Sequence, residues 1–207
     1  MSKHLVVLLD ESGSMNEIRS EIIDGMNVFI HQQRQVESEK NHQIKFTLVK
    51  FNSTVKEPKH LTLDKVPPMT QNDYIPGGMT SLYDAIGMTF GRMQTEKNVV
   101  AVIVTDGIEN SSYKFKRSHI MELIRRLEEK NNWKFVYLSS DIDTWNQGNN
   151  INLSNNTVFG FNECTGKHEY QGSRQNQVVS KAKLGSFLSS GAHNKCVADF
   201  RKQYSFK

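Results

Sequence analysis

Cysteine is scarce in this sequence, and the cysteines present do not suggest a metal site or a disulfide framework. Only Cys164 and Cys196 occur among the 207 residues, and they lie far apart in the chain. Two reduced thiols are therefore a simpler interpretation than a disulfide. The seven histidines form no pair spaced three or four residues apart. The sequence thus disfavours a zinc site built on a helix.

Long apolar runs are absent as well. The apolar run near the N-terminus ends at Leu9 because Asp10 follows it, and it is too short for the core of a signal peptide or for a membrane span. Hydrophobic residues make up 37% of the chain and charged residues 23%, which suffices for a buried core. We therefore expect a globular cytoplasmic protein with no membrane partner.

Charge is unevenly distributed along the chain. The formal net charge is +4, yet residues 167–207 alone contain eight Lys or Arg and only two acidic residues. Such a basic region could contact nucleic acid or an acidic protein surface. The alternative is a solvated helix surface. No nucleic-acid-binding motif accompanies the charge, and aromatic residues are sparse within it.

The order of apolar segments predicts an α/β fold. Apolar strands alternate with amphipathic segments, as in a Rossmann-like, doubly wound, mostly parallel sheet with helices on both faces. Strands are expected at residues 5–9, 44–51, 99–105, 135–139 and 157–159, and residues 53–57 are expected to form a short antiparallel edge strand. The proline-bearing stretch 58–76 is expected to be a loop that brings Thr80 to the site.

Three helices are predicted from apolar residues at helical spacing. The rows are Ile18, Ile22, Met26, Phe29 and Ile30; Leu82, Ala85, Ile86, Phe90 and Met93; and Ile120, Leu123, Ile124 and Leu127. Ser118 is the expected N-cap of the third helix. The pattern weakens after Phe161, so we expect a domain at residues 1–162 and a basic, partly helical C-terminal extension at residues 163–207, packed on the domain or appended to it.

Five oxygen-bearing side chains follow apolar runs at three separated points. They are Asp10, Ser12 and Ser14, then Thr80, then Asp106. Alternate residues of a segment that continues a strand lie on one side, so one carboxylate and two hydroxyls can converge on an ion. Ligands bind at the carboxyl ends of strands in such sheets, and hard oxygen donors favour Mg²⁺ or Mn²⁺. The alternative is a coincidence of helix caps and turn formers.

These residues resemble the metal-ion-dependent adhesion site (MIDAS) of the von Willebrand factor type A domain family. Asp-x-Ser-x-Ser at residues 10–14, Thr80, and Thr-Asp-Gly at residues 105–107 carry the resemblance, which extends from about residue 3 to residue 159. The sequence is most similar to the small, free-standing intracellular versions found in bacteria and phages. The resemblance implies a non-enzymatic module in which a partner protein's Asp or Glu docks on Mg²⁺.

Several neighbouring residues are candidates for the rim of this site. Glu11, Gly78, Glu109 and Asn110 are expected to line it and to contact the partner. For Glu11, an exposed acid in a first helical turn is the alternative. Asp84 is expected to be a hydrogen-bonding residue at a helix start. Trp145 is either an interface anchor or a core residue.

An enzyme is the competing hypothesis. Phosphatases of the haloacid dehalogenase type also place an Asp after the first strand, as a nucleophile beside Mg²⁺. They need a second acid two residues later, and here that position is Ser12. The interaction module is therefore the leading hypothesis.

Overall fold

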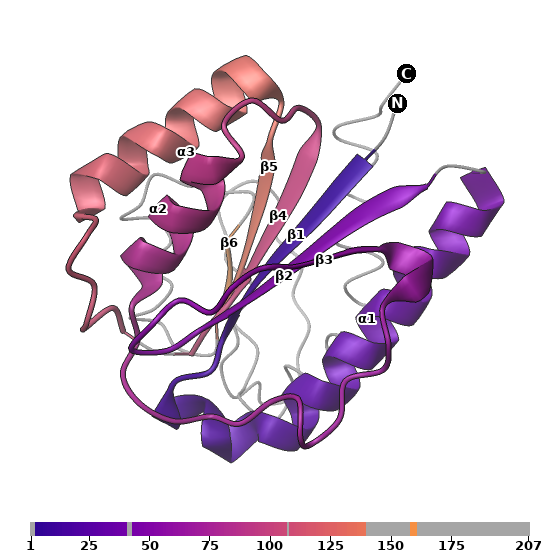
Figure 1. Ribbon diagram of the computed structural model, residues 1–207, viewed down its shortest axis with the longest axis horizontal. Coiled ribbons are helices and arrows are strands. Elements are labelled where there is room, and N and C mark those ends of the chain that lie inside the picture. Colours follow the sequence, from indigo (N-terminus) through magenta and orange to yellow (C-terminus); the bar gives the residue numbers. More distant parts are fainter. Residues whose placement is uncertain (1–2, 41–42, 107, 140–157, 161–207) are drawn as a thin grey trace, which may run out of the picture.

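The computed structural model describes residues 3–40, 43–106, 108–139 and 158–160. These residues form one six-stranded sheet flanked by helices (Figure 1). The strand order is β3-β2-β1-β4-β5-β6, and every neighbouring pair is parallel except β2 and β3. The predicted α/β fold, with its mostly parallel sheet and one antiparallel edge strand, is confirmed.

The elements have the following bounds. The strands are β1 Lys3–Asp10, β2 Ile44–Phe51, β3 Lys59–Thr62, β4 Val99–Val104, β5 Lys134–Ser139 and β6 Val158–Gly160. The α-helices are α1 Arg19–Lys40, α2 Leu82–Arg92 and α3 Arg117–Asn131, and the 3₁₀ helices are η1 Gly13–Ile18 and η2 Leu63–Lys65.

Strand β1 lies at the centre of the sheet and is buried on both faces. Its residues Leu5, Val7 and Leu9 belong to the core beneath α1, whereas Val6 and Leu8 belong to the core beneath α2 and α3. This alternation follows from the two-residue period of a strand. It explains why β1 is an uninterrupted apolar run, as is typical of a parallel strand covered on both sides.

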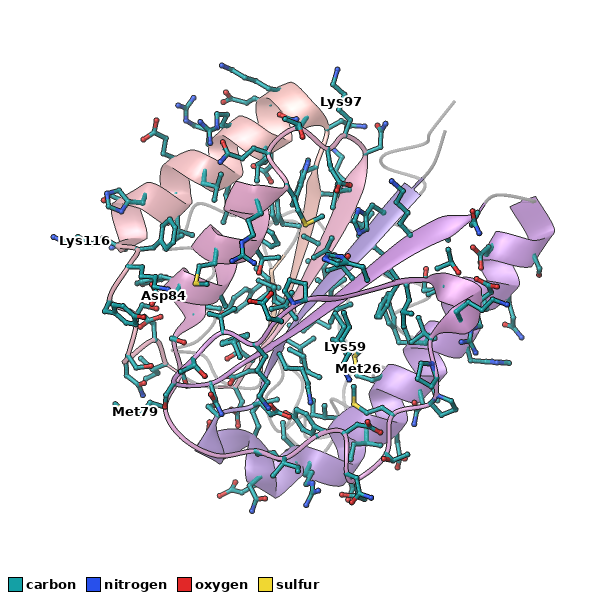
Figure 2. The ribbon with its side chains drawn as sticks, in the orientation of Figure 1. Met26, Lys59, Met79, Asp84, Lys97 and Lys116 are labelled. Atoms are coloured by element: carbon teal, nitrogen blue, oxygen red, sulfur yellow. The ribbon has the colours of Figure 1, made fainter. Side chains whose placement is uncertain are left out.

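The three α-helices cover opposite faces of the sheet. Helix α1 packs on one face, and α2 and α3 pack together on the other (Figure 1). All residues of the three predicted apolar rows are buried. Met26 of α1 points toward the sheet (Figure 2). The helical period in the sequence therefore identified the buried face of each helix.

The edge strand and one helix start differ from the prediction. Residues 53–57 form only one isolated bridge, between Phe51 and Val55, and the antiparallel edge strand is β3 instead. Pro58 separates the two pairings, and because proline has no N–H to donate, the ladder resumes only at Lys59. The N-cap of α3 is Lys116 rather than Ser118; the Lys116 N–H donates to His119 Nδ1 at 3.3 Å.

Several predictions fall outside the described residues. They concern both cysteines, Trp145 and the basic, partly helical C-terminal extension at residues 163–207. Within the described residues, no helix combines the length and the apolar character that a membrane crossing requires.

Candidate metal centre

The predicted metal-binding residues lie at the carboxyl edge of the central strands. Asp10 is the last residue of β1, and Asp106 follows β4 by two residues. The chain connects β1 to β2 on one side, whereas β4 lies on the other side of β1. The two carboxylates therefore lie at a topological switch point, where open α/β sheets bind ligands. Asp10 is fully buried and Asp106 is 6% exposed.

Both carboxylate oxygens of Asp10 accept hydrogen bonds. Oδ1 accepts the backbone N–H of Ser12 at 2.7 Å, and Oδ2 accepts the hydroxyl of Thr105 at 2.5 Å. The pKa of Asp10 is raised to about 6: burial is the main cause and the charge of Asp106 adds to it, whereas the hydrogen bonds from Thr105 and Ser12 partly offset the increase. The buried Tyr74 hydroxyl also donates to the carbonyl oxygen of Asp10 at 2.6 Å. No pattern in the sequence predicts this hydrogen bond from Tyr74 to Asp10.

The two serines join the first motif to Asp106. The Ser14 hydroxyl donates to Oδ1 of Asp106 at 2.7 Å across 92 positions of the chain. The hydroxyl oxygens of Ser12 and Ser14 lie 3.2 Å apart. Ser12 occupies the N-cap position of η1, but its side chain makes no capping hydrogen bond. The observed contacts thus favour convergence on a shared site over the alternative of helix capping.

Thr80 reaches this edge through its backbone. It is buried two residues before the start of α2, and its N–H donates to the side-chain oxygen of Asn110 at 2.9 Å. Its carbonyl oxygen accepts the N–H groups of Asn110 and Ser111 at 3.0 and 3.2 Å. Thr80 is therefore fixed against the loop that follows Asp106. Within the described part of the chain, its hydroxyl is not in the hydrogen-bonded chain that joins the other four residues.

Glu11 is buried, so the prediction that it lines an accessible rim is wrong. Its side chain is 0% exposed, with Lys50 Nζ 3.0 Å from Oε1 and Lys56 paired with Oε2. The N–H of Ile75 also donates to Oε1 at 3.0 Å. Burial by itself would raise the pKa of Glu11, but Lys56, the Ile75 N–H and Lys50 outweigh it and hold the pKa below its usual value. We call the segment that carries Asp10, Ser12 and Ser14 the first metal loop. Glu11 therefore fixes the first metal loop to β2 and to the segment before Thr80.

Gly78 lies beside the first metal loop, because its carbonyl oxygen accepts the N–H of Gly13 at 3.0 Å. Its φ of +81° favours glycine. A Cβ at this position would also lie 2.8 Å from the Ser53 hydroxyl. The local backbone therefore requires the glycine.

Two further rim candidates hold the loop after Asp106. The half-buried Glu109 carboxylate accepts the backbone N–H groups of Tyr83, Ser111 and Ser112 at 2.8 to 3.0 Å. An acid at the first turn of α2 is favourable because it meets unpaired N–H groups there. Asn110 is exposed and pairs with Thr80. Whether either residue contacts a partner stays a prediction.

Asp84 is a hydrogen-bonding residue, as expected. Its buried carboxylate accepts three consecutive backbone N–H groups, those of Tyr113, Lys114 and Phe115, at 2.9 to 3.1 Å. Asp84 lies in the first turn of α2 (Figure 2), and its side chain contacts the loop before α3. Asp84 thus fixes that loop to α2.

The donor set fits a hard divalent cation. Two buried carboxylates and two hydroxyl groups lie in one hydrogen-bonded chain at a single edge of the sheet. The described residues contain no cluster of three or more His, Cys, Asp or Glu that could hold a metal, so any ion at this edge must be shared between carboxylates and neutral oxygens. A cation would also compensate the cost of ionising the buried Asp10 beside Asp106.

Comparison with known proteins identifies a family for most of this chain. Residues 4–171 match the von Willebrand factor type A domain family. No curated protein sequence matches the chain.

Solved structures with similar folds come from varied sources. Proximal thread matrix protein 1 from the mussel byssus shares 16% identity with a TM-score of 0.54, covering 94% of this chain and 46% of that one. A von Willebrand factor type A protein from Catenulispora acidiphila shares 14% identity with a TM-score of 0.56, covering 91% of this chain and 41% of that one. The PilB minor pilin from Streptococcus sanguinis shares 10% identity with a TM-score of 0.58, covering 95% of this chain and 61% of that one.

The likeness to these structures establishes the fold. This chain spans only 41% to 61% of the length of the three proteins. A form of the mussel protein with a zinc-occupied MIDAS motif is also similar, at 17% identity with a TM-score of 0.52, covering 94% of this chain and 46% of that one.

Proposed function

This chain belongs to the von Willebrand factor type A domain family, and from that premise we propose that it is a protein-interaction module that depends on a divalent metal ion. The observation that carries this proposal is the hydrogen bond from Ser14 to Asp106. It joins two motifs that are distant in the sequence at the edge where such sheets bind ligands.

The proposed ligands are Asp10, Ser12, Ser14, Thr80 and Asp106. The ion would supply a positive centre able to attract an external carboxylate. The protein contributes the support: Thr105 and the Ser12 N–H orient Asp10, and Asn110 fixes the Thr80 backbone. Supporting residues of this kind hold metal ligands in place.

Mg²⁺ is the proposed ion, and Mn²⁺ is the proposed substitute. The candidate donors are all oxygens, which suit these hard cations better than zinc or copper. Zinc has been seen in the MIDAS motif of the mussel protein. A titration in which Mg²⁺, Mn²⁺ and Zn²⁺ compete for the site would identify the metal that this chain prefers.

The proposed partner is a protein that supplies an Asp or Glu. Mg²⁺ prefers about six oxygen ligands, and two carboxylates with three hydroxyls leave at least one position open. An external carboxylate oxygen can fill the open position, because it is a hard anionic donor of the kind that Mg²⁺ prefers. A bacterial or phage cytoplasm remains the predicted setting and rests on the sequence resemblance.

An interaction role is favoured over the phosphatase. The position where that class needs its second acid is Ser12. The family match also supports the interaction role. Nucleic-acid binding by the basic C-terminal extension stays a separate prediction, tested by truncation after residue 162 and by salt dependence.

The direct test compares metal binding with partner capture. Calorimetric titration with Mg²⁺ should show one site in the wild type and none in Asp10→Ala. The matched control is Asp64→Ala, which removes an exposed carboxylate that pairs with the exposed Lys65 and accepts a hydrogen bond from Thr62.

The same three proteins, immobilised in Mg²⁺, should differ in capture from the native cell. The wild type and Asp64→Ala should retain a partner that a chelator releases, and Asp10→Ala should not. Capture indifferent to both the chelator and Asp10→Ala would refute metal-dependent docking.

A further inference from the structure

Exposed apolar side chains gather on the two loops that carry Thr80 and Asp106. The described residues include five exposed large hydrophobic side chains, and four of them lie on these loops: Ile75 (62% exposed), Met79 (52%), Ile108 (51%) and Tyr113 (78%). We call these four residues the apolar collar. The fifth, Leu61 (39%), lies on β3.

The collar loops adjoin the candidate metal centre. The N–H of Asn110 donates to the Thr80 carbonyl oxygen at 3.0 Å, which joins the two loops to each other. The N–H of Gly77 donates to the carbonyl oxygen of Glu11 at 2.8 Å, which joins them to the first metal loop. Met79 immediately precedes Thr80, and its side chain points away from the body of the protein (Figure 2).

Three collar residues have a backbone N–H held by a side chain from another segment. Ile75 donates to Glu11 at 3.0 Å, and Met79 donates to the Ser53 hydroxyl at 2.9 Å. Tyr113 donates to Asp84 at 3.1 Å. Glu11 and Asp84 are themselves buried. These three apolar side chains are thus exposed on a fixed backbone, which lowers the entropy lost when a partner binds.

The position of these residues distinguishes them from ordinary surface hydrophobics, because four of the five exposed large hydrophobic side chains among the described residues lie on two loops that are hydrogen-bonded to each other. A single exposed apolar side chain needs no explanation, whereas several on loops that adjoin one site are expected of an interaction surface. Methionine and aromatic residues are also enriched in protein interfaces, and tyrosine is enriched among the residues that dominate binding energy. The collar therefore has the composition of an interface.

We propose that the apolar collar selects the partner, and that the acidic residue docking on the metal is flanked in its own chain by aliphatic or aromatic side chains. This inference rests on the proposed metal-dependent function, because the ion fixes where the acid binds. The cation complements the acid, and the collar complements its apolar neighbours. The partner segment is thus an Asp or Glu within an apolar sequence rather than within an acidic one.

Defined synthetic peptides test the collar. The probes are nonapeptides with a central Asp flanked by Leu and Phe, the same peptide flanked by Ser and Gly, and both peptides with Asn at the centre. Binding is measured in Mg²⁺ and in chelator for the wild type, Met79→Ser/Ile108→Ser and Leu61→Ser. Mg²⁺ affinity is measured separately by calorimetry, and thermal melting checks that each variant folds.

The wild type should bind the apolar Asp peptide at least about tenfold more tightly than the polar one, a difference of about 1.4 kcal/mol. Met79→Ser/Ile108→Ser should lose this preference and keep its Mg²⁺ affinity, whereas Leu61→Ser should keep both. Tyr113→Ser, a single surface change, should weaken the preference in the same direction.

Two results overturn the collar while leaving metal-dependent docking intact. One is equal affinity for apolar and polar Asp peptides, and the other is a preference that survives Met79→Ser/Ile108→Ser. Two other results would instead refute metal-dependent docking itself. One is that the wild type binds no Mg²⁺, and the other is that it binds the apolar peptides with Asp and with Asn at the centre equally well. Mg²⁺ binding without retention of any peptide also counts against the collar.

Discussion

Asp10 is a buried carboxyl group whose ionised form is costly in the metal-free protein. Burial raises its pKa to about 6, from an ordinary value near 3.8. The folded protein therefore holds this proton more tightly than the unfolded chain does. The stability associated with the protonated form is present below about pH 4 and is lost as the pH rises through about 6. The loss amounts to roughly 3 kcal/mol.

Asp10→Asn should remove this pH dependence. We expect the melting temperature of the chelator-treated wild type to fall from pH 4 to pH 7 by more than that of the variant, because asparagine does not ionise. Calorimetry across this range measures the difference, with the exposed Asp64→Asn as the control. Parallel curves for the wild type and Asp10→Asn would show that ionisation of Asp10 has no such cost.

Glu11→Gln should destabilise the fold, because it leaves two lysines near the buried side chain without their counter-charge. Lys50 is 14% exposed and Lys56 44%, so water offsets part of the loss. We expect the free energy of unfolding to fall by about 1 to 3 kcal/mol. Urea denaturation measures it.

The matched control for Glu11→Gln is Glu129→Gln, which breaks the exposed Arg125–Glu129 pair and should cost less than about 0.5 kcal/mol. Equal costs for the two substitutions would contradict a structural role for Glu11.

The sequence predicted the candidate metal residues better than their surroundings. Asp10 and Asp106 each follow an apolar strand, so their location at the sheet edge follows from the chain itself. The burial of Glu11 could not be predicted in this way, because its partners Lys50, Lys56 and Ile75 come from distant segments that only the fold brings together.

At the scale of elements, two glycines of α2 lie in different environments. A Cβ on Gly87 would overlap the Phe115 ring, whereas one on Gly91 would have only the Gln94 side-chain nitrogen nearby, at 3.8 Å. Gly87→Ala should therefore lower the free energy of unfolding by about 1 to 3 kcal/mol. Gly91→Ala should raise it by up to about 1 kcal/mol, since alanine favours the helix.

Chemical denaturation of the two glycine variants gives both values. A neutral or stabilising Gly87→Ala would mean that Phe115 can move away from α2 at little cost, contrary to the packing described.

The helices were predictable where the edge of the sheet was not. Each apolar row follows the helical period, and burying that row is the main source of helix stability. The edge strand depends instead on where pairing with β2 can resume after a turn. Residue 52 begins this turn, with the Asn52 side chain accepting the N–H of Thr54 at 3.2 Å, and Pro58 then delays the second strand.

At the scale of the whole molecule, Mg²⁺ should stabilise the fold. A ligand that binds only the folded state adds about 2.7 kcal/mol at one hundred times its dissociation constant. We expect the melting temperature to rise with Mg²⁺ concentration in the wild type. Ser14→Ala should require more Mg²⁺ for the same rise, because it removes a candidate donor that also contacts Asp106.

The control for Ser14→Ala is Ser20→Ala, which removes an exposed hydroxyl from α1. Thermal melting over a Mg²⁺ series compares the variants. Identical Mg²⁺ responses in Ser14→Ala and the wild type would exclude Ser14 from the metal site.

The architecture of the molecule also followed from the sequence, since alternating strands and helices leave few ways to arrange a parallel sheet. With β1 between β2 and β4, Asp10 and Asp106 necessarily lie at adjacent strand ends. The hydrogen bonds that arrange Ser12, Ser14 and Thr80 there depend on loop conformations that a period or a motif does not specify.

Anomalous diffraction from crystals grown with Mn²⁺ tests the central claim most directly, because manganese identifies its own position. We predict an anomalous peak at the carboxyl edge of β1 and β4, within coordination distance of Ser12 and Ser14 and of at least one of Asp10 and Asp106. A well-ordered edge without such a peak, in crystals where Mn²⁺ binds elsewhere or not at all, would contradict the proposed metal site.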